Sequence, residues 1–444
     1  MSTSEDPGAK PRRRTAIGTA MSVLNRVAGA RVVSRLGLSG PVNRLVFGTT
    51  KAGFQAAGAV TRTFAAASKL TAPRRLAPAG DSGVFDLRPT DEQQLIVDTV
   101  REFAAEQLRP AAAEADDKCA APPDLLTTAA SLGVTLIGVP EELGGVATER
   151  STVTNVLVAE AMAHGDLGLA LACLAPAAVS NALVRWGDET QQATYLPSFT
   201  GEDVPAAALA IQEERPLFDP FSLRTKAYRT AGGFVLDGVK SLVPRASAAE
   251  LFVVAADLDG RGPALFIVES SSVRVEAEPA MGLRAAGTGR LVLDKVALPA
   301  GALLTSSFED YADCVRLARL GWCALAVGTG AAVLGYVTGY VNDRVAFGEP
   351  VSHRQGVAFT VADIGTELDG MRLVTYRAAA RAERGQPFAR EVALARHLCA
   401  SKGMAIGSDG VQMLGGHGFV KEHPVERWYR DLRAVGLMEG AVLV

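Results

Sequence analysis

The feature that most constrains the fold is a change in the spacing of apolar residues near residue 206, and a second change near residue 304. Before the first change, segments such as DEQQLIVDTVREFAAEQLRPAAAEAD, which follows the candidate N-cap Thr90, keep helical spacing. Between the two changes, four segments rich in β-branched residues alternate with turn residues: GGFVLDGVKSLV, AELFVVAADL, PALFIVESSSVRVEA and TGRLVLDKVALP. Helical spacing then returns over 308–343, 355–383 and 388–413. This order predicts an α+β protein: an N-terminal helical domain, a middle antiparallel β domain and a C-terminal helical bundle.

The length of the chain supports several domains, because 444 residues exceed what one hydrophobic core usually serves. We expect an extension over 1–85 and domains over 86–204, 205–303 and 304–444. The extension differs from the rest in charge, since residues 7–80 contain no Asp or Glu. The first 80 residues carry about +11, although the whole chain carries −3.

The basic extension contains a pattern typical of an amphipathic helix. In residues 41–70, four cations are spaced by 7, 11 and 7 residues and fall on one stripe of a helix: Arg44, Lys51, Arg62 and Lys69. Such a helix can lie on an anionic membrane surface. A disordered tail, a helix that packs on the acidic body, or an organellar transit peptide are the alternatives. We expect a cytoplasmic protein, peripheral on the inner face of the membrane, with a mitochondrial location as the alternative.

Several classes of function find no support in the sequence. There is no recognised nucleic-acid motif, no secretory signal and no run of 18 uncharged apolar residues. The five histidines lack the spacing of metal ligands, and no GxSxG elbow is present. The five cysteines are unpaired in pattern, which predicts reduced, buried thiols. The glycines of GTGAAVLG, residues 328–335, indicate close helix packing more than a phosphate loop.

The C-terminal third holds the residues that suggest chemistry. Arg344, in NDRVAFGEPVSHRQGVAF, has the planar guanidinium that suits phosphate oxygens. Gly415 and Gly416, in VQMLGGHGF, indicate either a helix C-cap or close approach of the backbone to a cofactor. Glu439 stands alone in the apolar run GLMEGAVLV. An apolar setting raises the pKa of a carboxylate toward that of a useful base. The alternative is a partly exposed terminal glutamate without a role.

These segments also carry a resemblance. The sequences DRVAFGEPVSHRQ, QMLGGHGFVKEHPVERWYRDLRAVGLMEG, PEELGG and MGLRAAGTGRLVLDKVALPAGALL resemble those of the acyl-CoA dehydrogenase family. The resemblance extends from about residue 88 to the end of the chain. It implies the same three-domain order that the apolar spacing predicts.

The resemblance implies a reaction and a base. Enzymes of this family remove two hydrogens from the Cα–Cβ bond of an acyl-CoA thioester, with FAD as the hydride acceptor. Glu439 and Gly440 match the family's Glu-Gly turn, so Glu439 is the expected catalytic base. Other members carry the base on an earlier helix, where this chain has Ala318 in RLARLGW. In that segment Arg319 matches an arginine that positions the base or the substrate. The main-chain N–H of the catalytic glutamate helps to polarise the thioester carbonyl in the family.

The resemblance also implies cofactor contacts and partners. The positions that match FAD contacts, often to the FAD of a neighbouring subunit, are Arg344, Phe347, Gln355, Gln412, Gly415 and Gly416. The family is commonly dimeric or tetrameric, and some relatives form mixed oligomers. An electron-transfer flavoprotein is the usual electron acceptor. We therefore expect FAD, an acyl-CoA substrate, an oligomer and that acceptor, with no nucleic acid and no metal.

The sequence departs from the family in the expected flavin pocket. QEERPLFD, residues 212–219, replaces the family's TEPGAGSD, so that Gln212 replaces a threonine and Phe218 a small serine. Pro244 replaces a threonine in the family's flavin-facing strand, and Ala441 replaces a threonine after the Glu-Gly turn. We expect the fold to tolerate these changes, because none of the four positions is expected in the core. Two hypotheses follow: a working flavin dehydrogenase, or a flavin-poor member that serves as an acyl-CoA-binding or structural subunit.

Overall fold

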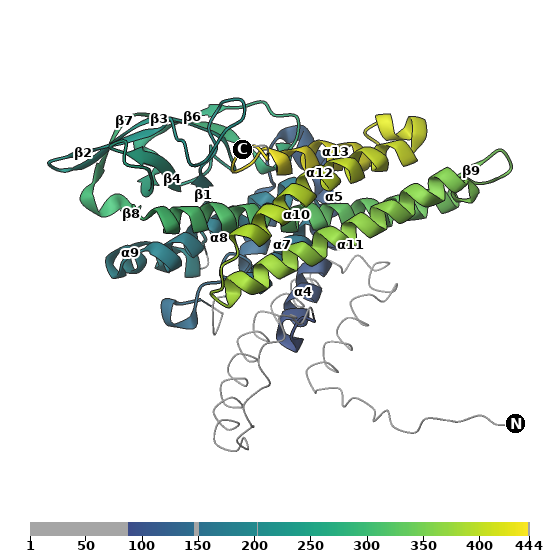
Figure 1. Cartoon of the computed structure of the whole chain (residues 1–444), viewed down its shortest axis with the longest axis horizontal. Helices are drawn as coiled ribbons and strands as arrows, with labels where there is room; N and C mark the ends of the chain where they lie inside the picture. Colours follow the sequence, from purple (N-terminus) through teal and green to yellow (C-terminus); the bar gives the residue numbers. More distant parts are fainter. Residues whose placement is uncertain (1–87, 146–150, 202, 443–444) are drawn as a thin grey trace, which may run out of the picture. The chain divides into compact units, whose positions relative to one another are not determined.

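The computed structural model describes residues 88–145, 151–201 and 203–442 (Figure 1). The basic extension, with the predicted helix over 41–70, lies outside the described residues. The described part begins with helices: α4 (Asp91–Phe103), continued by a π-helical turn (Ala104–Leu108), α5 (Arg109–Lys118), α6 (Pro123–Ser131), α7 (Thr152–Ala163), α8 (Leu167–Trp186) and α9 (Glu189–Thr200).

The first helix begins where the sequence predicts. The Thr90 hydroxyl accepts a hydrogen bond from the Gln93 main-chain N–H, and the Gln93 side chain accepts one from the Thr90 N–H. This reciprocal capping box satisfies two N–H groups that a helix start leaves without partners. The prediction of Thr90 as the N-cap is confirmed.

A mainly antiparallel sheet forms the middle of the chain, in the order β6-β7-β3-β2-β4-β5-β8, with β1 added beside β4. Only β1 and β2 run parallel to their neighbour β4. The strands are β1 (Ala207–Ala210), β2 (Lys226–Thr230), β3 (Gly233–Val243), β4 (Leu251–Leu258), β5 (Pro263–Glu269), β6 (Arg274–Ala277), β7 (Gly289–Pro299) and β8 (Leu303–Thr305).

The central strand β4 is buried on both faces. Val253 and Ala255 belong to the core that the sheet shares with α8 and α10, whereas Phe252 and Val254 belong to the core inside the β domain. Alternation along a strand sends neighbouring side chains to opposite faces. β4 therefore ties the β domain to the helices that carry the site.

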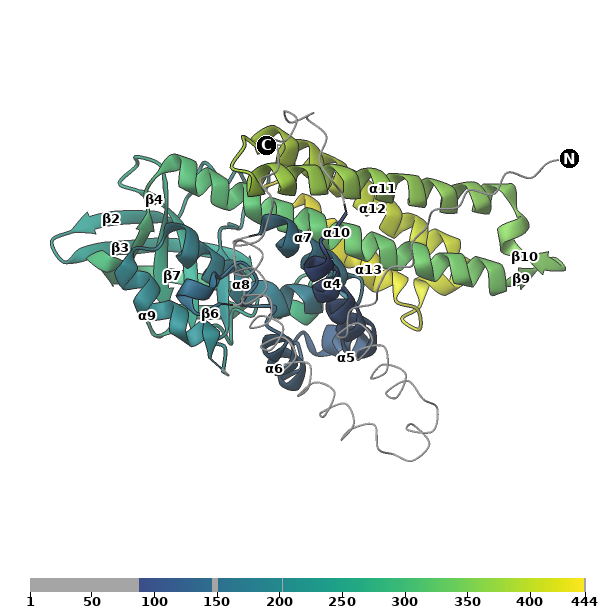
Figure 2. The same cartoon turned by 90° about the horizontal axis from the view of Figure 1, so that it is seen from below.

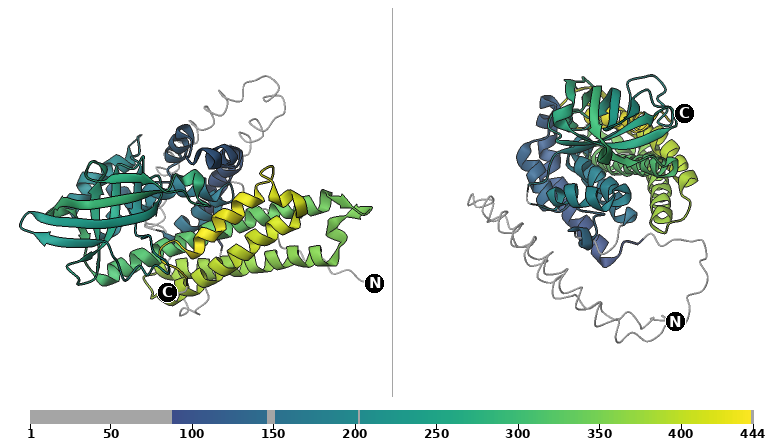
Figure 3. Two further views of the ribbon diagram at one scale, coloured as in Figure 1. Left: turned by 90° about the horizontal axis from the view of Figure 1, so that it is seen from above. Right: turned by 90° about the vertical axis from the view of Figure 1, so that its left-hand side faces the viewer.

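The third part is a bundle of long helices: α10 (Phe308–Asp343), α11 (Gln355–Glu383), α12 (Ala389–Met413) and the short α13 (Val425–Leu432). A small hairpin, β9 (Val345–Ala346) and β10 (Glu349–Pro350), joins α10 to α11. The sheet lies at the N-terminal end of α10, and the hairpin lies at the other end (Figures 2 and 3). The predicted α+β order is confirmed, and the three long helices agree with the predicted ranges to within one residue.

Close packing explains Gly328 in the middle of α10. A β-carbon at Gly328 would lie 2.1 Å from the Glu160 carbonyl oxygen of α7. The interpretation of GTGAAVLG as a packing segment is confirmed at Gly328, whereas Gly335 at its end has open space at its β-carbon.

Two helices of the described residues, α8 and α10, are long and apolar enough to cross a membrane by length and composition alone. Their most apolar windows are 78% and 72% buried inside the protein. They are therefore core helices of the fold described here, whose apolar surface packs against other elements.

Two predictions about burial are wrong. Cys119 is exposed, because it follows the end of α5 in a left-handed conformation, whereas the other four thiols are buried. Phe218 is 1% exposed and belongs to the core between the sheet and α8 and α10. The Phe218 ring fills an apolar space between the sheet and these two helices, so this position is part of the core.

Candidate active site

The turn that carries Glu439 has an unusual backbone. Glu439 has a φ of +54° and Gly440 a φ of +103°. A β-carbon at Gly440 would lie 2.6 Å from Cδ of Pro220 and 2.7 Å from Nη2 of Arg319, so only glycine fits there. A non-glycine residue at positive φ costs free energy and persists only where its surroundings fix it.

Two arginines fix this turn from two helices, Arg396 buried and Arg319 half-buried. Nε of Arg319, on α10, donates to the main-chain oxygen of Glu439 at 2.9 Å. Nη2 of Arg396, on α12, donates to the main-chain oxygens of Met438 and of Gly440, the latter at 2.7 Å. Arg319 could be named from the sequence, whereas Arg396 could not, because an arginine beside His397 in a predicted helix gives no specific signal.

The Glu439 carboxylate is buried and only half satisfied. Its residue is 7% exposed, and Oε1 accepts a hydrogen bond from the indole Nε1 of Trp322 at 3.4 Å. Oε2 is buried without a hydrogen-bond partner. Burial raises the pKa of Glu439, while the Trp322 bond and the charges of Arg396 and Arg319 oppose that rise. Trp322 was also missed, although it ends the segment RLARLGW.

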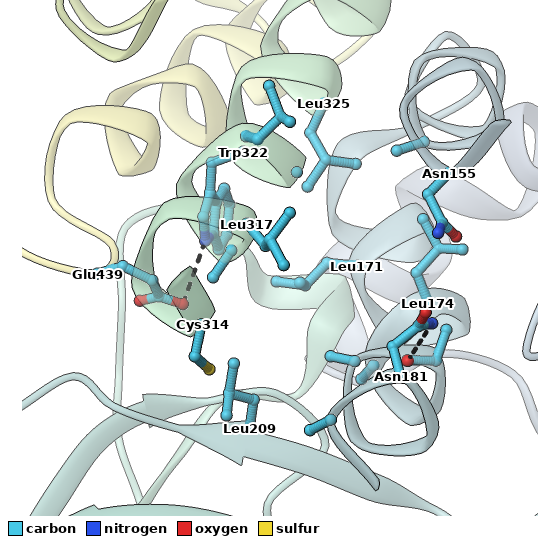
Figure 4. A pocket seen from close by; sticks show the side chains of 18 of the residues that line it. Asn155, Leu171, Leu174, Asn181, Leu209, Cys314, Leu317, Trp322, Leu325 and Glu439 are labelled. Carbon is cyan, nitrogen blue, oxygen red and sulfur yellow. Dashed lines mark hydrogen bonds between the residues drawn. The ribbon is translucent and has the colours of Figure 1, made fainter. Parts of the chain in front are cut away.

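Glu439 lies at the wall of a cavity of about 240 Å³ between α7, α8 and α10 (Figure 4). In Figure 4, Trp322 and Cys314 flank the Glu439 carboxylate, and Asn155 and Asn181 lie across the cavity. Leu209 of β1 and Pro244, after β3, complete the lining from the β domain. Most lining side chains are apolar, so the cavity suits an apolar group held beside a carboxylate.

The segment after β1 closes over the other side of the Glu439 turn. Oε1 of Gln212 accepts a hydrogen bond from the Gly440 N–H at 3.3 Å, and the Phe218 carbonyl accepts one from the Ala441 N–H at 2.9 Å. The Tyr311 hydroxyl donates to the Pro220 carbonyl at 2.6 Å. The departures from the family at Gln212, Phe218 and Ala441 therefore meet around one turn.

The residues predicted to contact FAD lie elsewhere. Arg344, Phe347 and Gln355 are exposed around the hairpin that follows α10, and Gln412, Gly415 and Gly416 are exposed at the end of α12. These two groups are neighbours, because the hydroxyl of Tyr340 lies 2.7 Å from Nδ1 of His417. Arg344 is 25 residues after Arg319 along the axis of α10, roughly 38 Å away. The structure thus gathers the predicted FAD contacts at one end of the bundle and the predicted base at the other.

The glycines after α12 have a local explanation as well. Gly415 follows the C-cap residue Leu414 and has a φ of +57°. This is the left-handed conformation that ends many helices, and glycine adopts it at the least cost. The interpretation of Gly415 as part of a helix C-cap is confirmed.

Comparison with known proteins bears on all three domains. Residues 90–203, 208–296 and 310–442 match the models of the N-terminal, middle and C-terminal domains of acyl-CoA dehydrogenases. The mitochondrial short/branched chain specific acyl-CoA dehydrogenase of Rattus norvegicus is 31% identical over 362 residues, 79% of this chain and 83% of the relative. Cyclohex-1-ene-1-carbonyl-CoA dehydrogenase of Geobacter metallireducens is 30% identical, over 79% of this chain and 95% of the relative.

Solved structures agree with the sequence relatives. Butyryl-CoA dehydrogenase from Megasphaera elsdenii superposes with a TM-score of 0.75 at 27% identity, covering 81% of this chain and 97% of that one. A glutaryl-CoA dehydrogenase from Mycobacterium smegmatis, solved in complex with FADH2, shares the fold with a TM-score of 0.73 at 24% identity, over 80% of this chain and 92% of that one. The three domain matches and the relative at 31% identity establish that this chain belongs to the acyl-CoA dehydrogenase family of FAD-dependent oxidoreductases.

Proposed function

We propose that this protein oxidises an acyl-CoA thioester between Cα and Cβ, and that Glu439 removes the α proton. The observation that carries the proposal is the free Oε2 of Glu439, buried without a partner at the wall of an apolar cavity. A buried carboxylate oxygen without a partner is costly unless a ligand uses it. An apolar acyl group in this cavity would bring its α C–H beside that oxygen.

Several residues around Glu439 have separate roles in proton removal. Burial raises the pKa of Glu439 and makes its carboxylate a stronger base. The Trp322 indole holds Oε1, so that Oε2 is left for the proton. Arg319 and Arg396 hold the turn through main-chain oxygens, which preserves the position of the carboxylate. The main-chain N–H of Glu439 is the donor that we assign to the thioester carbonyl, as in the family.

The described residues fit a flavin ring mainly by packing. Leu209 and Pro244 bring β-domain surface into the cavity that Glu439 lines, which suits the flat face of a ring. Pro244 and Ala441 have no side-chain hydroxyl that could hydrogen-bond to the flavin. Gln212 is a polar side chain that contacts the Glu439 turn, through its bond to the Gly440 N–H. When bound, FAD supplies the acceptor for the β hydride.

The predicted FAD contacts at the far end of the bundle fit a second copy of the chain. Arg344, Phe347, Gln355, Gln412, Gly415 and Gly416 lie too far from Glu439 to serve the same flavin ring, and all six are exposed. We propose that they hold the FAD of a neighbouring subunit in a dimer or tetramer.

A second candidate is a flavin-poor subunit that binds acyl-CoA or shapes a hetero-oligomer. The observation in its favour is that two main-chain donors of the Glu439 turn, at Gly440 and Ala441, already bond to Gln212 and Phe218. Pro244 has no N–H to add. Each lost flavin hydrogen bond weakens binding by about 1 kcal/mol, so several losses together lower the affinity for FAD by on the order of 10²–10³-fold.

Flavin content separates the two candidates. The purified protein should be yellow, and its visible flavin band should bleach when an acyl-CoA is added without oxygen. A colourless protein that stays unreduced after FAD is added would contradict the dehydrogenase and support the second candidate. The same protein should still bind acyl-CoA, since the cavity does not depend on the flavin.

Two further proposals concern partners and location. An electron-transfer flavoprotein is the acceptor that we propose for the reduced cofactor, because it is the usual acceptor in the family. We also propose that residues 41–70 bring the protein to an anionic membrane surface, with a mitochondrial location as the alternative. Pelleting with anionic vesicles should be lost when residues 1–80 are deleted, and unchanged pelleting would refute the membrane proposal.

A further inference from the structure

Gly321 stands in the middle of α10 without a structural reason. Glycine weakens a helix, so a helical glycine usually marks close packing or a special backbone conformation. At Gly330, on the same helix, a β-carbon would lie 3.2 Å from Cδ1 of Leu368, so packing is tight there. At Gly321 a β-carbon would meet nothing within 4 Å, and the backbone is ordinary helix.

The space beside Gly321 belongs to the cavity that Glu439 lines. Gly321 is half-buried and contributes to the cavity wall, together with the small residues Ala318 on the same helix and Ala178 on α8. The side chains of Leu317 and Leu325, one turn away on either side, also stay more than 4 Å from the missing β-carbon. Protein interiors are close-packed, so an apolar hollow of this kind is rare unless a ligand fills it.

The hollow lies close to the base. Gly321 precedes Trp322, whose indole holds the Glu439 carboxylate, and follows Arg319, which holds the Glu439 main chain. Residues on one face of a helix rise about 5 Å per turn, so the hollow is within roughly one turn of the level of the carboxylate. The bulk that the hollow accepts is therefore next to the reacting carbons, and not at the far end of the acyl chain.

We propose that the acyl group of the substrate is branched or cyclic next to its reacting carbons, and that the hollow beside Gly321 holds that bulk. The inference rests on the proposed function, since it takes the cavity as the acyl site. A straight short chain would leave the hollow empty, whereas a methyl branch or a ring would bury additional apolar surface there.

The test is to fill the hollow in two steps in the full-length protein, with Gly321→Ala, which adds one carbon, and Gly321→Val, which adds three. The matched controls are Gly335→Ala and Gly335→Val, because Gly335 also lies on α10 with open space at its β-carbon but is exposed outside the cavity. Dissociation constants are measured by calorimetry for 2-methylbutanoyl-CoA, cyclohexanecarbonyl-CoA and butanoyl-CoA.

We expect Gly321→Ala to weaken binding of the branched and cyclic thioesters by about 10-fold, the effect of one carbon in a pocket, and Gly321→Val to weaken it further. Butanoyl-CoA should lose clearly less affinity than the branched and cyclic thioesters, and the Gly335 variants should behave like the wild type. Equal effects on the three thioesters, or no effect at all, would overturn the inference.

Measuring both binding and turnover distinguishes the inference about the substrate from the proposed reaction. If the variants change binding as expected but no thioester is oxidised, the inference about the substrate stands and the proposed reaction falls. If all three thioesters are oxidised and Gly321→Val affects them equally, the proposed reaction stands and the inference falls.

Discussion

Among single residues, Trp322 offers a specific test of how the base is tuned. Its indole N–H stabilises the charged form of Glu439 and so lowers the pKa of that carboxylate. Trp322→Phe should therefore raise the pKa and move the acid limb of the kcat–pH profile to higher pH, with little change in KM. Trp186→Phe is the control, because Trp186 lines the same cavity and donates no hydrogen bond to Glu439. An unmoved acid limb would show that the indole only fills space.

The buried charge of Glu439 also predicts a dependence of stability on pH. Burial raises the pKa of Glu439 in the folded state, so the folded protein binds more protons than the unfolded chain between the two pKa values. Stability is therefore lost as pH rises through that window. Glu439→Gln should melt at a higher temperature than the wild type at pH 7.5, and the difference should shrink as pH falls toward the ordinary glutamate pKa of about 4.3. A difference that does not depend on pH would contradict this account.

At the scale of elements, the buried ion pair between Lys240 and Glu213 fixes the position of the segment that carries Gln212. Nζ of Lys240 on β3 donates to Glu213 at 2.9 Å, and Glu213 also accepts the N–H groups of Arg224 and Thr225. Burial lowers the pKa of Lys240 to about 8, and Glu213 opposes that shift. Glu213 in turn holds the chain directly after Gln212, beside the Glu439 turn.

Breaking this pair should be costly. Lys240→Met leaves a buried carboxylate without its cation, and we expect a loss of about 3–5 kcal/mol in the free energy of unfolding. The double variant Lys240→Met/Glu213→Gln should recover part of the loss. Lys226→Met removes a more exposed partner of Asp257 and should cost at most about 1 kcal/mol. Equal losses in the two single variants, measured by urea unfolding, would refute the special role of the Lys240 pair.

The helices and strands also show how much of the fold could be predicted from the sequence. The helices α10, α11 and α12 agree with their predicted ranges because 25 to 36 residues of apolar spacing give a strong signal. Of the strands, β3, β4 and β7 were predicted from their own β-branched runs, and one further run contains both β5 and β6. The strands β1, β2 and β8, of three to five residues, were missed because so short a run has no clear period.

The site shows a similar limit. Glu439 and its neighbours Arg319 and Gly440 could be named from motifs, and the structure brings them together. Trp322 and Arg396 could not, because their importance comes from tertiary packing that spacing does not encode. Phe218 was placed outside the core for the same reason, since its burial depends on a space between the sheet and two helices.

For the whole molecule, the separation of the predicted FAD contacts from Glu439 predicts complementation between subunits. Arg344→Ala and Glu439→Gln should each abolish activity when made alone. When the two variants are co-expressed, a site that takes Glu439 from one copy and Arg344 from another is intact, so part of the activity should return. Activity that stays absent in verified mixed oligomers would contradict sites shared between copies.

The most direct test of the central claim is the exchange of the α hydrogen of an acyl-CoA in deuterium oxide, followed by NMR. Proton removal by Glu439 predicts exchange with the wild-type protein, and a rate lower by on the order of 10²–10⁴-fold with Glu439→Gln, the usual contribution of a general base. Glu422→Gln, which changes an exposed acid of the same C-terminal segment, should exchange like the wild type. Exchange at an unchanged rate in Glu439→Gln would contradict the role of this carboxylate.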